Sequence, residues 1–324
     1  MTGTAITRLG LQFTSFAFPG VADSDLFDRL TESARAAEGA GFDSLWTMDH
    51  VHQIDSLGGP DEPILEAYTT LGAFAAVTST ARLGVLVTAA GLRNPALLAK
   101  MVTTIDIISR GRALLGVGAG WYEEEFAAYG APFPPIRERL ERLEDSVRIC
   151  RAMFTVDAAT LEGRHQSVAE ARNIPRPITD GGPPIMIGGS GERTLIPMIA
   201  RLGDGCNFFG GPATVRHKIE VLDRACAAAG RDPATITKTW LGRVIVADSE
   251  QRLQADLELL SRQLRVSVAA AKAFALAGFP DEVAKQVRRY RDAGVDGILV
   301  SLNDVTDLDH LRRVGAVLAE ALAD

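Results

Sequence analysis

AEGAGFDSLW, residues 37–46, connects the end of a helical pattern to a short apolar run. A glycine after a helix suits the left-handed backbone found there, and an aspartate after it favours a turn before a strand. The same order of residue types recurs in ARLGDGCNFF, residues 200–209, and in RDAGVDGILV, residues 291–300. The chain therefore repeats one unit, in which a helix leads into a strand.

Eight short apolar runs are expected to be β-strands, because turn-forming residues bound them and longer helical patterns separate them. The runs are RLGLQF at 8–13, SLWTM at 44–48, LGVLV at 83–87, ALLGVG at 113–118, PIMIG at 184–188, CNFFG at 206–210, WLGRVIV at 240–246 and GILVS at 297–301. The helical patterns cover residues 24–39, 65–79, 95–109, 136–154, 192–202, 213–229, 281–293 and 308–322. Residues 250–277 are expected to add one or two more helices.

This alternation predicts an α/β fold. Strands that are apolar throughout and are separated by helices form parallel sheets with the helices outside. Eight such units predict closure into a (β/α)8 barrel, the TIM barrel, whose functional sites lie at the carboxyl ends of the strands. An open doubly wound sheet is the alternative.

We expect one domain over residues 1–324, with an insertion at about 155–184 before the fifth strand. The insertion contains TLEGRHQSV and the proline-rich NIPRPITDGGPP, and it is too long for an ordinary loop. We expect it to form a short hairpin that caps the mouth of the barrel or meets a partner.

The composition excludes several classes of protein. Of the 324 residues, 47% are hydrophobic and 23% are charged, which is typical of a folded chain with a large core. The net charge of −7 offers no general attraction for nucleic acid or for an anionic membrane. The start, MTGTAITRLGLQF, lacks the pattern of a signal peptide, and no uncharged run could span a bilayer. We therefore expect a cytoplasmic protein with no nucleic acid or membrane partner.

The three cysteines, Cys150, Cys206 and Cys226, are far apart and form no CxxC pair. An odd number of isolated cysteines indicates neither a disulfide framework nor a zinc site. We expect all three to be reduced and structural, and we expect no metal.

GVGAGWYEEEF, residues 116–126, resembles the phosphate-binding loop of a dinucleotide fold. That fold uses the spacing GxGxxG after an early strand, whereas Gly116, Gly118 and Gly120 are spaced GxGxG and follow three earlier units. In a barrel these glycines lie at the carboxyl end of the fourth strand, where they would let a flat ligand approach the backbone.

Three carboxylates, Glu123, Glu124 and Glu125, come soon after these glycines. Carboxylates in the first turn of a helix are stabilised by the helix dipole and usually face water. Glu124 and Glu125 are the two that could instead turn toward the mouth of the barrel.

Asp49 and His50 directly follow the second strand. Ionisable groups at the carboxyl ends of barrel strands converge on one pocket, so the imidazole could give a hydrogen bond or a proton to a ligand. The neighbouring carboxylate could hold the charge state of the imidazole. A solvated loop is the alternative interpretation.

A second run of small residues, Gly188, Gly189, Ser190 and Gly191, follows the fifth strand and leads into an expected helix. Backbone N–H groups in such a run form a phosphate site, to which Arg193 could add a positive charge. A simple glycine turn is the alternative.

The order and spacing of five segments resemble the luciferase-like monooxygenase superfamily, in particular its branch of oxidoreductases that use the deazaflavin coenzyme F420. The segments are AEGAGFDSLWTMDHV at 37–51, EAYTTLGAFAAVTSTARLGVLVT at 66–88, RNPALLAKMVTTIDIISRGRALLGVGAGWYEEEFAAYG at 93–130, PPIMIGGSGERTL at 183–195 and ARLGDGCNFF at 200–209. The resemblance covers nearly the whole chain and implies a (β/α)8 barrel of the bacterial luciferase-like type with an insertion.

By that resemblance the ring of F420 lies in the mouth of the barrel. The end of the third strand matches a bulge behind the ring that often carries a non-proline cis peptide, which we place between Leu86 and Val87. The glycine run after the fifth strand matches the segment that binds the phosphate-bearing tail. The residues assigned to the cofactor are Asp49, His50, Leu86, Val87, Thr88, Gly118, Ala119, Gly120, Trp121, Gly188, Gly189, Ser190 and Gly191.

The resemblance implies an F420-dependent oxidoreductase that transfers a hydride to or from a small organic substrate. His50 would take the proton role, and Asp49 would orient it or contact the cofactor. Dehydrogenases of this branch tend to carry a glutamate directly after the GxGxG turn, where this chain has Trp121, so their substrates cannot be transferred to it.

Two alternatives remain, an FMN-dependent monooxygenase on the same barrel and a non-catalytic protein that binds a flavin or a deazaflavin. The resemblance also implies a homodimer.

Overall fold

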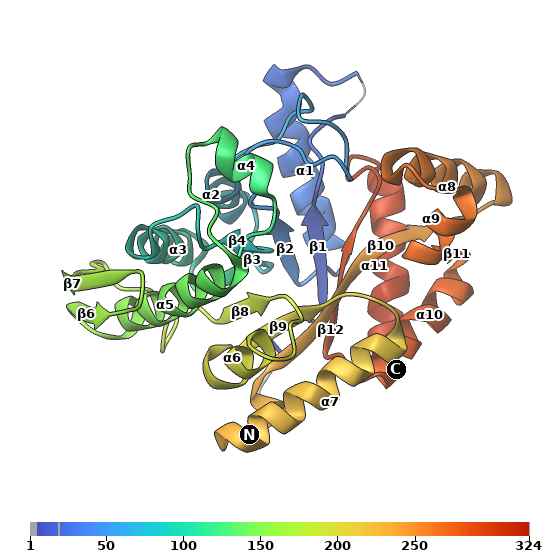
Figure 1. Ribbon diagram of the computed structural model, residues 1–324. Coiled ribbons are helices and arrows are strands. Elements are labelled where there is room, and N and C mark those ends of the chain that lie inside the picture. Colours follow the sequence, from blue (N-terminus) through green and yellow to red (C-terminus); the bar gives the residue numbers. More distant parts are fainter. Residues whose placement is uncertain (1–4, 19, 324) are drawn as a thin grey trace.

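The computed structural model describes residues 5–18 and 20–323 and shows a closed barrel of eight parallel strands inside a layer of helices (Figure 1). The order around the barrel is β1-β2-β3-β5-β8-β9-β10-β12, and β12 pairs with β1 to close it. The eight strands are β1 (Leu9–Phe13), β2 (Ser44–Thr47), β3 (Arg82–Val85), β5 (Ala113–Gly118), β8 (Ile185–Gly188), β9 (Gly205–Phe208), β10 (Thr237–Val246) and β12 (Gly297–Ser301). The predicted (β/α)8 barrel is confirmed, and each of its strands lies at an expected position.

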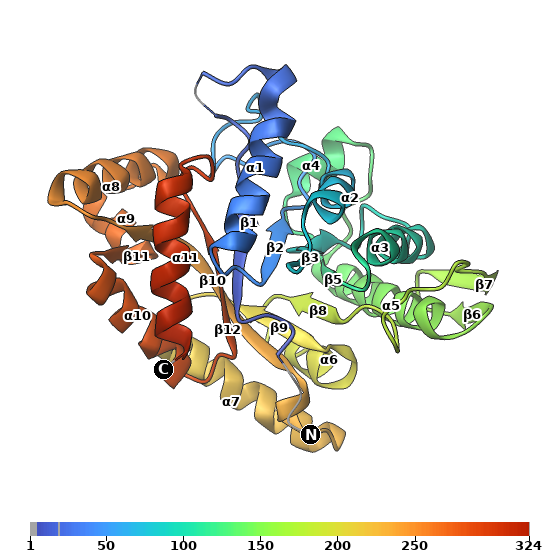
Figure 2. The same ribbon diagram turned by 180° about the vertical axis from the view of Figure 1, so that it is seen from behind.

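The helices lie outside the strands, and Figure 2 shows α1 and α11 in front of the strands, behind which both lie in Figure 1. They are α1 (Leu26–Gly39), α2 (Ala67–Val77), α3 (Pro95–Ser109), α4 (Glu123–Ala128), α5 (Ile136–Thr155), α6 (Leu195–Leu202), α7 (Pro212–Ala229), α8 (Glu250–Leu264), α9 (Val268–Phe274), α10 (Pro280–Asp292) and α11 (Leu308–Ala323). Short 3₁₀ turns cover Asp23–Asp25 and Pro233–Thr235. Within the described residues, no helix is both long and apolar enough to cross a bilayer.

The repeated aspartate of the helix-to-strand unit has a structural role beyond the turn itself. The carboxylate of Asp43, just before β2, accepts the backbone N–H of Arg8 at 2.8 Å. Asp204 and Asp296 do the same for Ile185 and Lys238, also at 2.8 Å. Each aspartate therefore holds the amino end of the neighbouring strand, which fixes the pairing of adjacent units at the base of the barrel.

The interior of the barrel is filled by side chains from alternate positions of the strands. Trp46 lies in an inner cluster with Leu114, Met186 and Leu299, and its indole N–H donates to a serine hydroxyl on the same strand at 2.8 Å. Gly10 leaves room for this indole, because a Cβ there would lie 2.8 Å from its Nε1 atom. The interior is thus a packed core whose open end lies at the carboxyl ends of the strands.

The insertion forms the expected short hairpin, from β6 (Ala159–Glu162) and β7 (Ser167–Ala171). The expectation that it caps the barrel mouth is wrong, because the hairpin packs along α5 at the side of the barrel (Figure 1). The carboxylate of Asp145 on α5 accepts the backbone N–H groups of Arg164, His165 and Gln166. These three bonds hold the hairpin turn against the helix, away from the mouth.

Two further strands were not expected from the sequence. The short β4 (Thr88–Ala89) pairs with β5, and β11 (Ala275–Gly278) pairs with β10 beyond the barrel. Residues 275–277 were assigned to a helix, but β10 is ten residues long and its last four pair with β11. The strand β11 therefore forms by pairing with the last four residues of β10, and no local sequence pattern predicts it.

Candidate active site

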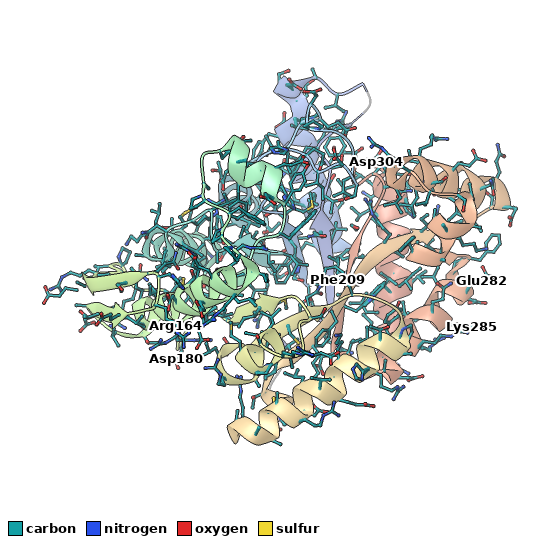
Figure 3. The ribbon with its side chains drawn as sticks, in the orientation of Figure 1. Arg164, Asp180, Phe209, Glu282, Lys285 and Asp304 are labelled. Atoms are coloured by element: carbon teal, nitrogen blue, oxygen red, sulfur yellow. The ribbon has the colours of Figure 1, made fainter. Side chains whose placement is uncertain are left out.

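A cavity of about 650 Å³ opens at the carboxyl ends of the strands. Loops after β2, β3, β5, β8 and β9 line it, together with the start of α5. Phe209, which follows β9, is 54% exposed and lies at the centre of the view in Figure 3. The residues predicted from the sequence that line the cavity are Asp49, His50, Leu86, Val87, Gly118, Ala119, Gly120, Trp121, Gly188, Gly189 and Gly191.

Two predicted residues do not line the cavity. Thr88 is fully buried, and its hydroxyl forms a hydrogen bond with the hydroxyl of Tyr68 on α2. Ser190 accepts a hydrogen bond from the amine of Lys218 through its backbone oxygen at 3.0 Å.

The predicted cis peptide between Leu86 and Val87 is present and marks the bulge after β3. Val87 points into a gap that two glycines leave open. A Cβ on Gly118 would lie 2.7 Å from one methyl carbon of Val87, and a Cβ on Gly188 would lie 2.8 Å from each of the two methyl carbons of Val87. We expected Gly118 to let a flat ligand approach the backbone and Gly188 to take part in a phosphate site. In the structure both glycines line the cavity and also make room for Val87, which lines it as well.

His50 is held by Glu125 of α4. The imidazole Nδ1 lies 3.2 and 3.3 Å from the two carboxylate oxygens of Glu125, which also accepts the backbone N–H of Val51 at 2.6 Å. The Glu125 side chain is 2% exposed and that of His50 is 14% exposed. A buried carboxylate on Nδ1 favours the tautomer with a proton on that nitrogen, which leaves Nε2 available for a ligand.

Glu125 faces inward because α4 is anchored by the next residue. Phe126 is buried, and its ring fills space that Gly91 and Gly120 leave, since a Cβ on either would lie 2.8 Å from that ring. Glu123 and Glu124 are exposed, so only one of the three acids turns toward the mouth. The sequence marked Glu125 as a possible exception, but it contained no signal for the partnership with His50.

Asp49 belongs to a separate network. Its two carboxylate oxygens accept hydrogen bonds from Nε and Nη2 of Arg93, which also pairs with Glu66 at 2.8 Å. The guanidinium lies 4.8 Å from the centre of the Tyr68 ring. Burial acts to lower the pKa of Arg93, but the bond and charge of Asp49 outweigh it and raise that pKa above its ordinary value.

This network bears on the expectation that Asp49 orients His50. The carboxylate is 2% exposed, and its hydrogen bonds in the described chain go to Arg93 and to the N–H of Ala89. The partner of His50 is therefore Glu125, while Asp49 fixes the loop between β3 and α3. Sequence reasoning missed Arg93 and Glu66, because they come from distant loops without a recognisable motif.

Aromatic side chains form one rim of the cavity. Trp121 is 63% exposed, and its ring centre lies 5.7 Å from that of His50 and 5.2 Å from that of Tyr122. His52 packs edge-on against Tyr122 and stacks on Tyr129. Trp121 is thus the exposed aromatic wall beside the imidazole.

The glycine run after β8, the strand that pairs with β5, lines another part of the cavity. Gly191 accepts backbone hydrogen bonds from Leu195 and Ile196, so the chain turns into α6 there, although the helix begins three residues later than the expected start at residue 192. Gly189 has φ +118°, which favours glycine. Gly188, Gly189, Gly191, Glu192 and Arg193 of this turn line the cavity. Backbone N–H groups and a guanidinium are the chemistry of an anion site, whereas the carboxylate of Glu192 is not.

Comparisons with known proteins identify the family of the chain. Residues 10–272 match the family described as luciferase-like monooxygenase. The F420-dependent glucose-6-phosphate dehydrogenase of Amycolatopsis mediterranei (strain U-32) is 28% identical over 295 residues, which cover 83% of this chain and 87% of that protein.

Two solved structures share the fold. An F420-dependent secondary alcohol dehydrogenase, in complex with an F420-acetone adduct, superposes with a TM-score of 0.82 at 21% identity, covering 98% of this chain and 99% of that one. The monooxygenase RslO1 from Streptomyces bottropensis superposes with a TM-score of 0.80 at 22% identity, covering 98% of each chain.

Proposed function

Because the chain belongs to the luciferase-like monooxygenase family, we propose that it is an F420-dependent oxidoreductase that transfers a hydride between the deazaflavin and a small organic substrate. The observation that carries the proposal is the pairing of His50 with the buried Glu125 at the wall of the cavity. A proton donor or acceptor held at a fixed position is what hydride transfer to a carbonyl, or from an alcohol, requires of the protein.

The residues of the cavity fit a deazaflavin. Val87, seated between two glycines, offers an apolar surface to a flat ring, and the turn from Gly188 to Arg193 offers N–H groups and a cation to an anionic tail. When bound, a deazaflavin supplies a carbon centre that carries two electrons as a hydride and reacts poorly with oxygen. The protein then has to orient the reactants and exclude water.

His50 holds the transferred proton at Nε2 in this proposal. Glu125 fixes the imidazole through Nδ1 and stabilises the ring when it is positively charged. Trp121 occupies the position at which related dehydrogenases tend to have an acid, and its indole cannot transfer a proton there. The proton role therefore rests on His50, while Trp121 covers the imidazole from solvent.

A paired activity screen tests the reaction class. Oxidised F420 is offered with alcohols and reduced F420 with the matching carbonyl compounds, and the visible absorbance of the deazaflavin is followed. In parallel, reduced FMN is offered with the same compounds in an oxygen electrode. We expect substrate-dependent turnover with F420 that His50→Ala abolishes. Substrate-dependent oxygen uptake with reduced FMN alone would favour the monooxygenase instead.

The assembly state is a separate part of the proposal. The family resemblance supports a homodimer, which light scattering on the purified protein tests directly. A monomer at micromolar concentration would contradict it.

A further inference from the structure

Arg243 projects from β10 into the interior of the barrel. Leu241, two residues earlier, packs against the inner cluster that contains Leu299, and side chains two apart on a strand share a face. Arg243 pairs in register with Ser301, the last residue of β12, and with Ala275, the first residue of β11. It therefore lies at the carboxyl end of the barrel, the same end as the cavity.

The guanidinium of Arg243 has one hydrogen bond in the described chain, from Nη1 to the carbonyl oxygen of Leu302 at 3.1 Å. Over the described residues no carboxylate forms an ion pair with it, whereas Arg93 at the same mouth pairs with both Asp49 and Glu66. Burial lowers the pKa of Arg243 to about 10. Most of its five donors are left without a protein acceptor.

An unpaired cation inside a barrel is costly, because it loses water and gains no opposite charge. Arg243 is only partly exposed, so solvent compensates it incompletely. The loops after β2, β3, β5, β8 and β9 line the cavity, and β10 with β12 completes the ring of strands at the mouth. Arg243 is not itself among the residues that line the cavity, so a ligand seated before His50 reaches it by extending past this lining toward the carboxyl end of β10.

We propose that Arg243 binds the oxyanion group, a carboxylate or a phosphate, of the substrate. A planar guanidinium with free donors matches such a group in charge and in geometry. The inference rests on the proposed function only where it calls the ligand a substrate, since binding of the anion itself requires no F420.

The test is a calorimetric titration of the purified protein with inorganic phosphate. We expect millimolar binding to the wild-type protein, a loss of about tenfold or more in Arg243→Gln, and a smaller loss in Arg243→Lys, which keeps the charge. Arg137→Gln removes a surface guanidinium that is 86% exposed, and it should leave binding unchanged. Equal binding to wild type and Arg243→Gln, or no binding to the wild type, would overturn the proposal.

Arg193→Gln separates this site from the glycine turn after β8, which could also hold phosphate. Binding that disappears in Arg193→Gln and persists in Arg243→Gln belongs to the turn and refutes the role of Arg243. Should Arg243→Gln fail to fold, the same comparison is made with Arg243→Lys. A phosphate affinity of Arg243→Lys equal to that of the wild type then refutes the role of Arg243.

An F420 titration of the same samples keeps the two proposals apart. We expect wild type and Arg243→Gln to bind F420 alike. If neither binds F420, the proposed function fails, while the phosphate result still decides whether Arg243 holds an oxyanion.

Discussion

Replacing Glu125 by glutamine isolates the electrostatic part of the His50–Glu125 pair. The amide oxygen can still accept the N–H of Val51, which the carboxylate accepts at 2.6 Å, so the loop after β2 keeps its shape. The amide nitrogen, however, faces Nδ1 of His50 and can only donate. The amide thus keeps one acceptor 3.3 Å from Nδ1, places a donor at the other position, 3.2 Å away, and offers no negative charge to a protonated ring.

The expected size of the effect follows from the bond that is lost. Hydrogen bonds to charged groups contribute about 1.5 to 3 kcal/mol, and each 1.4 kcal/mol corresponds to about tenfold in rate. Because the Glu125 side chain is 2% exposed, water does not replace the carboxylate. We therefore expect Glu125→Gln to reduce kcat with the best substrate by about 10- to 150-fold, with little change in F420 affinity.

The assay is steady-state turnover followed by deazaflavin absorbance, together with a fluorescence titration of F420. Glu124→Gln is the matched control, because that neighbouring side chain is exposed. A kcat for Glu125→Gln within about twofold of wild type would refute the positioning role. A loss confined to F420 binding would equally refute it, since Glu125 would then act on the cofactor site.

Three further predictions concern stability, each measured by urea unfolding. Asp204→Ala leaves the first N–H of β8 without its acceptor and should cost about 1 to 3 kcal/mol; an unchanged midpoint would refute the role of the repeated aspartates. Gly116→Ala should cost about 3 kcal/mol or prevent folding, because its Cβ would lie 2.0 Å from the backbone oxygen of Val85; near-wild-type stability would contradict this. Burial lowers the pKa of His310 below 6.5, and its Nε2 accepts the N–H of Val246. The free energy of unfolding should therefore fall as the pH drops through about 6.5, because the unfolded chain then binds the proton more readily. His310→Gln should flatten this dependence, and parallel curves of stability against pH for the variant and the wild type would contradict it.

The sequence predicted the barrel because its determinants are local. Glycine and aspartate recur between helices and strands, and each Asp, such as Asp204, acts on the immediately neighbouring strand. The strand β11 escaped prediction because its residues have no strand pattern of their own and depend on the free edge of β10. The mouth-capping role of the insertion failed for the same reason, since contacts with Asp145 on α5 determine where the hairpin lies.

The site was predictable where residues directly follow a strand, as His50 and Val87 do. Its polar contacts were less predictable, because they join segments far apart in the chain. Glu125 meets His50 across 75 positions, and Arg93 meets Asp49 across 44. A sequence shows which acids and bases are present near a strand end, but packing such as that of Phe126 decides which of them turns inward.

The central claim is that the cavity holds a deazaflavin, and parallel fluorescence titrations of the purified protein with F420 and with FMN test it most directly. We predict saturable, micromolar or tighter binding of F420 and at least tenfold weaker binding of FMN. The affinity for F420 should also fall in Gly188→Val, because the added side chain would displace Val87. Tight binding of FMN with negligible binding of F420 would contradict the account.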